Sequence, residues 1–140
     1  MKVVIDPNVL IAIISIRSPS RWLFDCIISG KIQMSVSTEI LLEYREILQR
    51  KTNFAVSENI ADFISTSPYV EKTDIFFKFN LIEKDSSDNK FVDCAISADA
   101  DCLISNDKHF QILKQIDFPN VNILTLNEFE NLYKAEIIKL

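Results

Sequence analysis

Four carboxylates stand where a folded α/β chain can bring them together: Asp6, Glu43, Asp88 and Asp107. Carboxylates packed side by side repel each other, so one of them normally takes up a proton unless a cation lies between them. All-oxygen ligand sets favour hard ions such as Mg²⁺ or Mn²⁺ over zinc. A divalent ion of this kind can activate water and stabilise charge on a phosphoryl group. Phosphodiester hydrolysis is therefore the reaction class that suits this set best.

Positioning these acids requires an alternation of strands and helices, which the hydrophobic pattern predicts. The predicted strands are 2–5, 32–36, 102–104 and 121–124, with 75–79 and 81–82 as further candidates. The predicted helices are 9–16, 21–29, 38–50, 56–65, 88–98, 108–116 and 127–138. Strands that alternate with helices predict a mostly parallel sheet covered on both faces. We expect one domain over residues 1–140 with a three-layer α/β/α fold.

Three of the acids follow predicted strands. Asp6 ends the first strand, Asp107 follows the strand at 102–104, and Asp88 begins a helix after the 75–82 region. Right-handed crossovers bring the carboxyl ends of parallel strands to one edge of the sheet, where ligands bind in open α/β folds. We therefore expect these three carboxylates to share one edge.

Glu43 is the acid of the 38–50 helix best placed to face that edge. On a helical wheel it lies at the border of the apolar face, whereas Glu39 and Glu46 lie farther round, toward solvent. The apolar face consists of Ile40, Leu41, Tyr44, Ile47 and Leu48.

Composition excludes several classes of site. The chain has 140 residues, 48% of them hydrophobic, which is enough for one ordinary core. Its single glycine rules out a P-loop and a GxGxxG dinucleotide fingerprint. Its single histidine disfavours a zinc site or a histidine-based triad. The three cysteines lack CxxC spacing and are expected to be reduced, with two of them in the core.

The charge and the apolar runs bear on partners and location. The net charge of -5 argues against a nucleic-acid binder, unless bound metal ions cancel clustered acids. We see no signal peptide and no run long enough to span a membrane, so we expect a cytoplasmic protein without membrane association.

Four segments of the chain together resemble the PIN domain family. They are Val3-Val4-Ile5-Asp6-Pro7-Asn8-Val9-Leu10, residues 37–48 (STEILLEYREIL), residues 85–95 (DSSDNKFVDCA) and residues 100–107 (ADCLISND). The resemblance extends from residue 2 to about residue 130. It is closest to the branch labelled as PIN-family toxins.

The resemblance implies an Mg²⁺- or Mn²⁺-dependent endoribonuclease, and many family members are the toxin half of a bacterial toxin–antitoxin pair. It implies Asp6, Glu43, Asp88 and Asp107 as both metal ligands and catalytic residues, with Asn8 as a polar neighbour of Asp6. Expected partners are an RNA substrate, a cognate antitoxin and a second copy of the chain. The chain departs from the family in having Pro7 where Thr or Ser is common. It also has Ser105-Asn106 where Thr-Gly is common. Neither departure removes a carboxylate.

Simpler interpretations stay open for individual residues. Asp6 can simply end a strand in a polar turn, and Glu43 can be an ordinary solvated acid of its helix. Asp88 can serve only to complement the dipole at a helix N-terminus, and Asp107 can serve only as a helix N-cap. Asp93 lies opposite the apolar side of its helix, which predicts exposure, although it is kept as an accessory acid of the site. Asp85 is expected in a loop, and His109 either contacts phosphate or is solvated. The basic residues that can contact phosphate or simply form the surface are Arg17, Arg21, Arg45, Lys84, Lys90 and Lys108.

Two other functions compete with the nuclease. A phosphatase that resembles the haloacid dehalogenase superfamily also has an Asp at the end of its first strand. That mechanism needs a second Asp two residues later as general acid, and this chain has Asn8. A non-catalytic domain that binds a partner through an acidic pocket is the third possibility.

Overall fold

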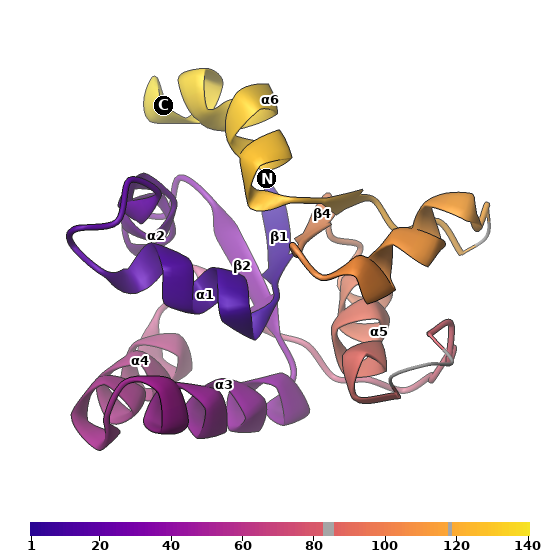
Figure 1. The fold of residues 1–140 in the computed structure, drawn as a ribbon, viewed down its shortest axis with the longest axis horizontal. Coiled ribbons are helices and arrows are strands. Elements are labelled where there is room, and N and C mark those ends of the chain that lie inside the picture. Colours follow the sequence, from indigo (N-terminus) through magenta and orange to yellow (C-terminus); the bar gives the residue numbers. More distant parts are fainter. Residues whose placement is uncertain (83–85, 118) are drawn as a thin grey trace.

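A single parallel sheet organises the chain in the computed structural model, which describes residues 1–82, 86–117 and 119–140 (Figure 1). Its five strands lie in the order β3-β2-β1-β4-β5, and every neighbouring pair is parallel. The strands are β1 (Lys2–Ile5), β2 (Gln33–Val36), β3 (Val70–Lys72), β4 (Cys102–Ile104) and β5 (Ile123–Leu124). All strands being parallel, their carboxyl ends meet at one edge.

Helices connect successive strands and cover the sheet. The first half of the chain contains α1 (Pro7–Ile14), α2 (Arg21–Ile28), α3 (Thr38–Lys51) and α4 (Phe54–Thr66). The second half contains the 3₁₀ turn η1 (Ser86–Asp88), α5 (Asn89–Ser97), the 3₁₀ helix η2 (Lys108–Gln115) and α6 (Leu126–Ile138). Side chains cap the first turns of α3 and α6. Ser37 accepts the Ile40 N–H at the start of α3, and Thr125 forms a capping box with Glu128 at the start of α6.

The strand order makes the fold three-layered. From β1 the chain moves to β2 and β3 on one side, then returns to β4 and β5 on the other. Because crossovers are right-handed, this reversal puts α5 on the face opposite α1 to α4. Figure 1 shows α1 to α4 on one side of β1 and β2 and α5 on the other, and α5 contacts β1, β2 and β4. The expected three-layer α/β/α fold is confirmed.

The centre of the sheet is buried on both faces. Val3, Val4 and Ile5 of β1 have no exposed surface, as expected for a parallel strand with helices above and below. The C-terminal helix α6 closes the core against α2, where the rings of Phe129 and Trp22 stack with centroids 6.3 Å apart. All three cysteines are buried and free, so the core holds one cysteine more than the two that were expected there.

The expected strands at 75–79 and 81–82 are wrong. The third strand is Val70–Lys72, and residues 73–82 lie outside any strand or helix. Side chains of α5 provide the hydrogen bonds that a neighbouring strand would otherwise give. Asp93 accepts the Phe79 N–H at 3.0 Å, and the Asn89 amide pairs with both the N–H and the carbonyl of Ile82 at 2.9 Å each.

The remaining helices differ from expectation only at their ends or in type. The 108–116 segment is a 3₁₀ helix, and α1 begins at Pro7, two residues earlier than expected, because proline is well suited to the first helical turn. Within the described residues, no helix has both the length and the apolar character needed to cross a membrane.

Candidate metal centre

Asp6 is held at the point where β1 becomes α1. It caps α1 by accepting the Asn8 N–H at 3.1 Å through Oδ1, and it accepts the Ser105 hydroxyl at 2.5 Å through Oδ2. Only 6% of its surface is exposed. Burial raises the pKa of this carboxyl, the hydrogen bonds from Ser105 and Asn8 oppose the rise, and the negative charge of Asp107 adds to it. A nearby cation would relieve that electrostatic cost.

Ser105 joins the carboxyl ends of β1 and β4. Its fully buried hydroxyl donates to Asp6 and accepts the Asp107 N–H at 3.0 Å. Asp107 then caps η2 by accepting the His109 N–H at 2.9 Å. A continuous chain of hydrogen bonds therefore runs from Asp6 through Ser105 and Asp107 to His109.

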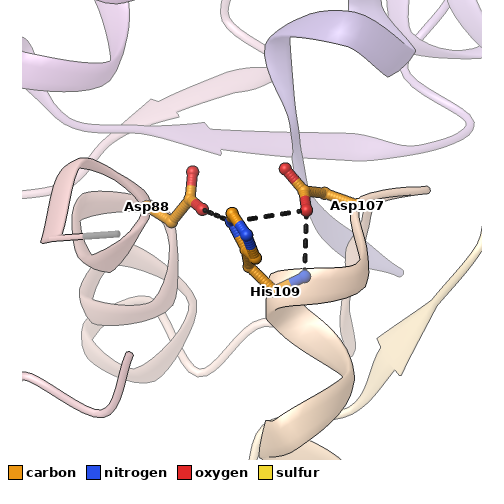
Figure 2. Close-up of side chains that lie close together, drawn as sticks. All are labelled: Asp88, Asp107 and His109. Carbon is orange, nitrogen blue, oxygen red and sulfur yellow. Dashed lines mark hydrogen bonds and ion pairs between the residues drawn. The ribbon is translucent and has the colours of Figure 1, made fainter. Parts of the chain in front are cut away.

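Asp88 approaches this chain from the start of α5. Its Oδ2 lies 3.4 Å from His109 Nδ1, which in turn lies 3.6 Å from Asp107 Oδ1. Figure 2 shows the imidazole between the two carboxylates, with Asp88 on one side and Asp107 on the other. One donor atom from each of the three residues lies within 4.8 Å of the other two.

Glu43 projects from α3 with its side chain only 20% exposed, in agreement with its place at the border of the apolar face on the helical wheel. Glu39 and Glu46 are exposed, also as predicted. Glu43 Oε1 contacts Lys90 Nζ of α5 at 3.1 Å. In the same way Asn8 Oδ1 accepts a hydrogen bond from Lys51 Nζ at 2.7 Å. Two ammonium groups thus lie against the polar residues of the site.

The four predicted acids are not brought together equally. Asp88 and Asp107 belong to the compact group, and Asp6 is linked to Asp107 through Ser105. Within the described part of the chain, Glu43 is outside the group of three donor atoms. Two carboxylates and an imidazole are all established ligands of divalent cations, so the donor set fits a metal ion of that charge.

The exposure predicted for Asp93 is wrong. Only 3% of its surface is exposed, because residues 73–82 cover that side of α5. Burial raises the pKa of its carboxyl, and the hydrogen bond from the Phe79 N–H opposes the rise. In this structure Asp93 anchors the backbone of a connecting segment.

The basic residues proposed to contact phosphate are partly engaged elsewhere. Arg21 pairs with Asp25 at 2.8 Å on α2, and Arg45 with Glu58 at 3.5 Å between α3 and α4. Lys84 and Asp85 lie outside the described residues.

Ser105 was not predicted to act at the site, and His109 was predicted either to contact phosphate or to be solvated, not to lie between two of the acids. Ser105 had been noted only as a departure from the family pattern. The sequence signal for His109 is its place in the first turn of a helix that Asp107 caps. Side chains on a helix lean toward its N-terminus, so a residue in the first turn can lie beside the capping residue.

Comparison with known proteins supports the family and the fold. The family model described as "PIN domain" matches residues 2–109, which include all four predicted acids and His109. A chain of the crystal structure of VapBC2 from Rickettsia felis bound to a DNA fragment from their promoter is similar, with a TM-score of 0.61 and 14% identity. The match covers 89% of this chain and 98% of that one. None of the curated proteins compared with the chain matches it.

Proposed function

Since this chain belongs to the PIN domain family, we propose that it hydrolyses phosphodiester bonds of RNA with Mg²⁺ or Mn²⁺ as cofactor. The proposed metal-binding and catalytic residues are Asp6, Glu43, Asp88 and Asp107. The observation that carries the proposal is the convergence at the carboxyl edge of the sheet. Asp88 and Asp107 lie within one ion's reach, and Ser105 links Asp107 to Asp6.

The residues of the site have separate tasks in this proposal. A divalent ion, when bound, supplies positive charge that favours deprotonation of water and offsets the charge of the phosphate under attack. Asp88 and Asp107 hold the ion together, with Asp6 and Glu43 as further ligands whose negative charge helps to attract it. Ser105 orients Asp6 and Asp107, each through one hydrogen bond. Lys90 and Lys51, at the border of the site, can contact the neighbouring phosphates of the RNA backbone.

The proposed physiological role is that of the toxin in a toxin–antitoxin pair. The similar solved structure is named as VapBC2, and the chain resembles the PIN-family toxins. A cognate antitoxin would inhibit by placing a basic side chain among the acids. The contact of Lys90 with Glu43 supports this, because it shows that an ammonium group fits beside one of them. A homodimer is also expected from the family.

The test is cleavage of a mixed single-stranded RNA by the purified chain in Mg²⁺, in Mn²⁺ and in EDTA. We expect cleavage with metal, none in EDTA, and a loss of at least about a hundredfold in Asp6→Asn, as when an electrostatic group is removed from a phosphoryl-transfer site. Asp62→Asn is the matched control, because it makes the same change at an exposed position on α4. Intact cleavage in Asp6→Asn would place the chemistry elsewhere.

Three further measurements separate the competing functions. Release of inorganic phosphate from p-nitrophenyl phosphate, without RNA cleavage, would favour the phosphatase. Metal binding with neither activity would favour a binding domain. Growth arrest on expression of the chain, relieved by co-expression of an adjacent small gene product, is the result expected of a toxin. Harmless overexpression would contradict that role.

A further inference from the structure

His109 occupies a position that a metal ligand would take. Its Nδ1 lies 3.4 Å from Asp88 Oδ2 and 3.6 Å from Asp107 Oδ1. Dashed lines in Figure 2 mark the two contacts. Two neighbouring ligands of an octahedral ion at about 2.1 Å are themselves separated by about 3 Å. The observed separations exceed this by about half an ångström, and the donor atoms of Asp88 and Asp107 lie within 4.8 Å of each other. The ring is therefore close to the geometry in which all three side chains share one ion.

Hydrogen bonds also hold the backbone that carries the imidazole, through the backbone N–H groups of His109 and Asp107. The His109 N–H donates to Asp107 Oδ1, and the Asp107 N–H donates to the buried hydroxyl of Ser105. These bonds fix the first turn of η2, from which the ring projects, against the end of β4. The His109 side chain remains 43% exposed, so an ion can reach the ring from solvent.

We propose that His109 is a ligand of the metal ion held by Asp88 and Asp107, and that its nitrogen makes the site favour first-row transition ions over Mg²⁺. The inference rests on the metal site of the proposed function but not on RNA as the substrate. Carboxylate ligands alone accept Mg²⁺ readily, whereas imidazole is a ligand for transition ions. A mixed set of two carboxylates and one imidazole therefore shifts the preference from Mg²⁺ toward ions such as Mn²⁺.

The alternative role of the ring is that of a counter-ion. A protonated imidazole between two carboxylates would neutralise them without binding metal, and both distances fit an ion pair as well. The two roles differ in one observable property, because only a ligand transfers spin density from Mn²⁺ to its nitrogen. The test must therefore detect nitrogen at the metal, in addition to measuring affinity.

The composition of the chain makes that detection unambiguous. His109 is the only histidine, so a coupling to imidazole nitrogen in a protein without a histidine tag can come from no other side chain. We would load the untagged chain with Mn²⁺ and record pulsed electron paramagnetic resonance spectra of the native chain and of His109→Gln. Dissociation constants for Mn²⁺ and for Mg²⁺ would be measured by calorimetry on the same samples.

The expected result is a nitrogen coupling in the native chain that disappears in His109→Gln. Loss of the ligand should weaken Mn²⁺ binding by at least about tenfold, because even removal of a group that only supports a metal ligand has an effect of this size. Mg²⁺ binding should change by much less. The control is Lys108→Gln, which removes a positive charge from the adjacent residue of η2 and should leave the nitrogen coupling intact.

The outcomes separate this inference from the proposed function. Mn²⁺ that binds without nitrogen coupling, and with equal affinity in His109→Gln, would overturn the inference even if RNA is cleaved. Nitrogen coupling without any cleavage of RNA would uphold the inference and contradict the ribonuclease. A native chain that binds neither Mn²⁺ nor Mg²⁺ would contradict both.

Discussion

Replacing Ser105 by alanine removes the hydroxyl that joins the ends of β1 and β4. That hydroxyl is fully buried, donates to Asp6 at 2.5 Å and accepts the Asp107 N–H at 3.0 Å. A hydrogen bond to a charged group contributes about 1.5–3 kcal/mol, and one between neutral groups about 0.5–1.5 kcal/mol. We therefore expect Ser105→Ala to lower the free energy of unfolding by about 2–4 kcal/mol at pH 7 in metal-free buffer.

The loss of unfolding free energy in Ser105→Ala should become smaller as the pH falls. Burial raises the pKa of Asp6 in the folded protein above its ordinary value of 3.8, so the folded state takes up this proton first and gains stability as the pH falls through the raised pKa. The hydrogen bond from Ser105 opposes the rise, so the variant should bind the proton at a still higher pH. The difference in stability between the two proteins therefore decreases from pH 7 downward, because a neutral carboxyl no longer strengthens the bond.

Urea unfolding in EDTA, followed by the fluorescence of Trp22, measures both effects. The matched control is Ser57→Ala, which removes an equally buried hydroxyl that donates to the neutral carbonyl of Arg45 at 2.8 Å. We expect this control to lose about 0.5–1.5 kcal/mol at every pH. If Ser105→Ala loses no more stability than Ser57→Ala at pH 7, or if its loss stays constant from pH 7 down to the ordinary aspartate pKa of 3.8, the Ser105 hydroxyl does not stabilise a charged Asp6.

Substitutions at three further positions test the fold by urea unfolding. Tyr44→Phe removes a fully buried hydroxyl that donates to the carbonyl of the last residue of β1, and should lower the free energy of unfolding by about 1–3 kcal/mol. Unchanged stability would mean that this bond does not form in solution. Gly30→Ala adds a methyl group 2.6 Å from the ring of Tyr69 at a φ of +81°, and should cost about 1–2 kcal/mol. A neutral result would show that the ring and the backbone adjust freely. Asp93→Asn keeps an acceptor for the Phe79 N–H and should change stability by less than about 1 kcal/mol, whereas Asp93→Ala should cost about 1–3 kcal/mol. Equal losses would show that the charge of Asp93 matters more than the hydrogen bond.

The features predicted from sequence are those that depend on nearby residues. A short β-branched run that stops at Asp6 predicts a strand end, and a Ser-Thr-Glu start predicts the helix that carries Glu43. Their positions in the structure agree with both expectations. The strand before Asp107 was found in the same way. In each case the local pattern and the tertiary packing favour the same conformation.

The features that were missed depend on contacts between distant segments. Asp93 is opposite the apolar side of α5 on the wheel, yet residues 73–82 cover it. Aromatic residues in that segment favour a strand locally, but Asn89 and Asp93 supply hydrogen-bond partners that keep it out of the sheet. Ser105 acquires its role only when β4 lies beside β1, which no local pattern encodes.

The strand order also sets when the site can form during synthesis. β1 leaves the ribosome first, but its neighbour β4 follows about a hundred residues later, since Val3 pairs with Cys102. A nascent chain folds from its N-terminus, and contacts between distant segments close late. Asp6 therefore remains without Ser105 and Asp107 until β4 and the turn after it have emerged. If the substrate is RNA, this delay protects the messenger and the ribosome that are producing the chain, because no part of the chain made earlier contains the assembled site.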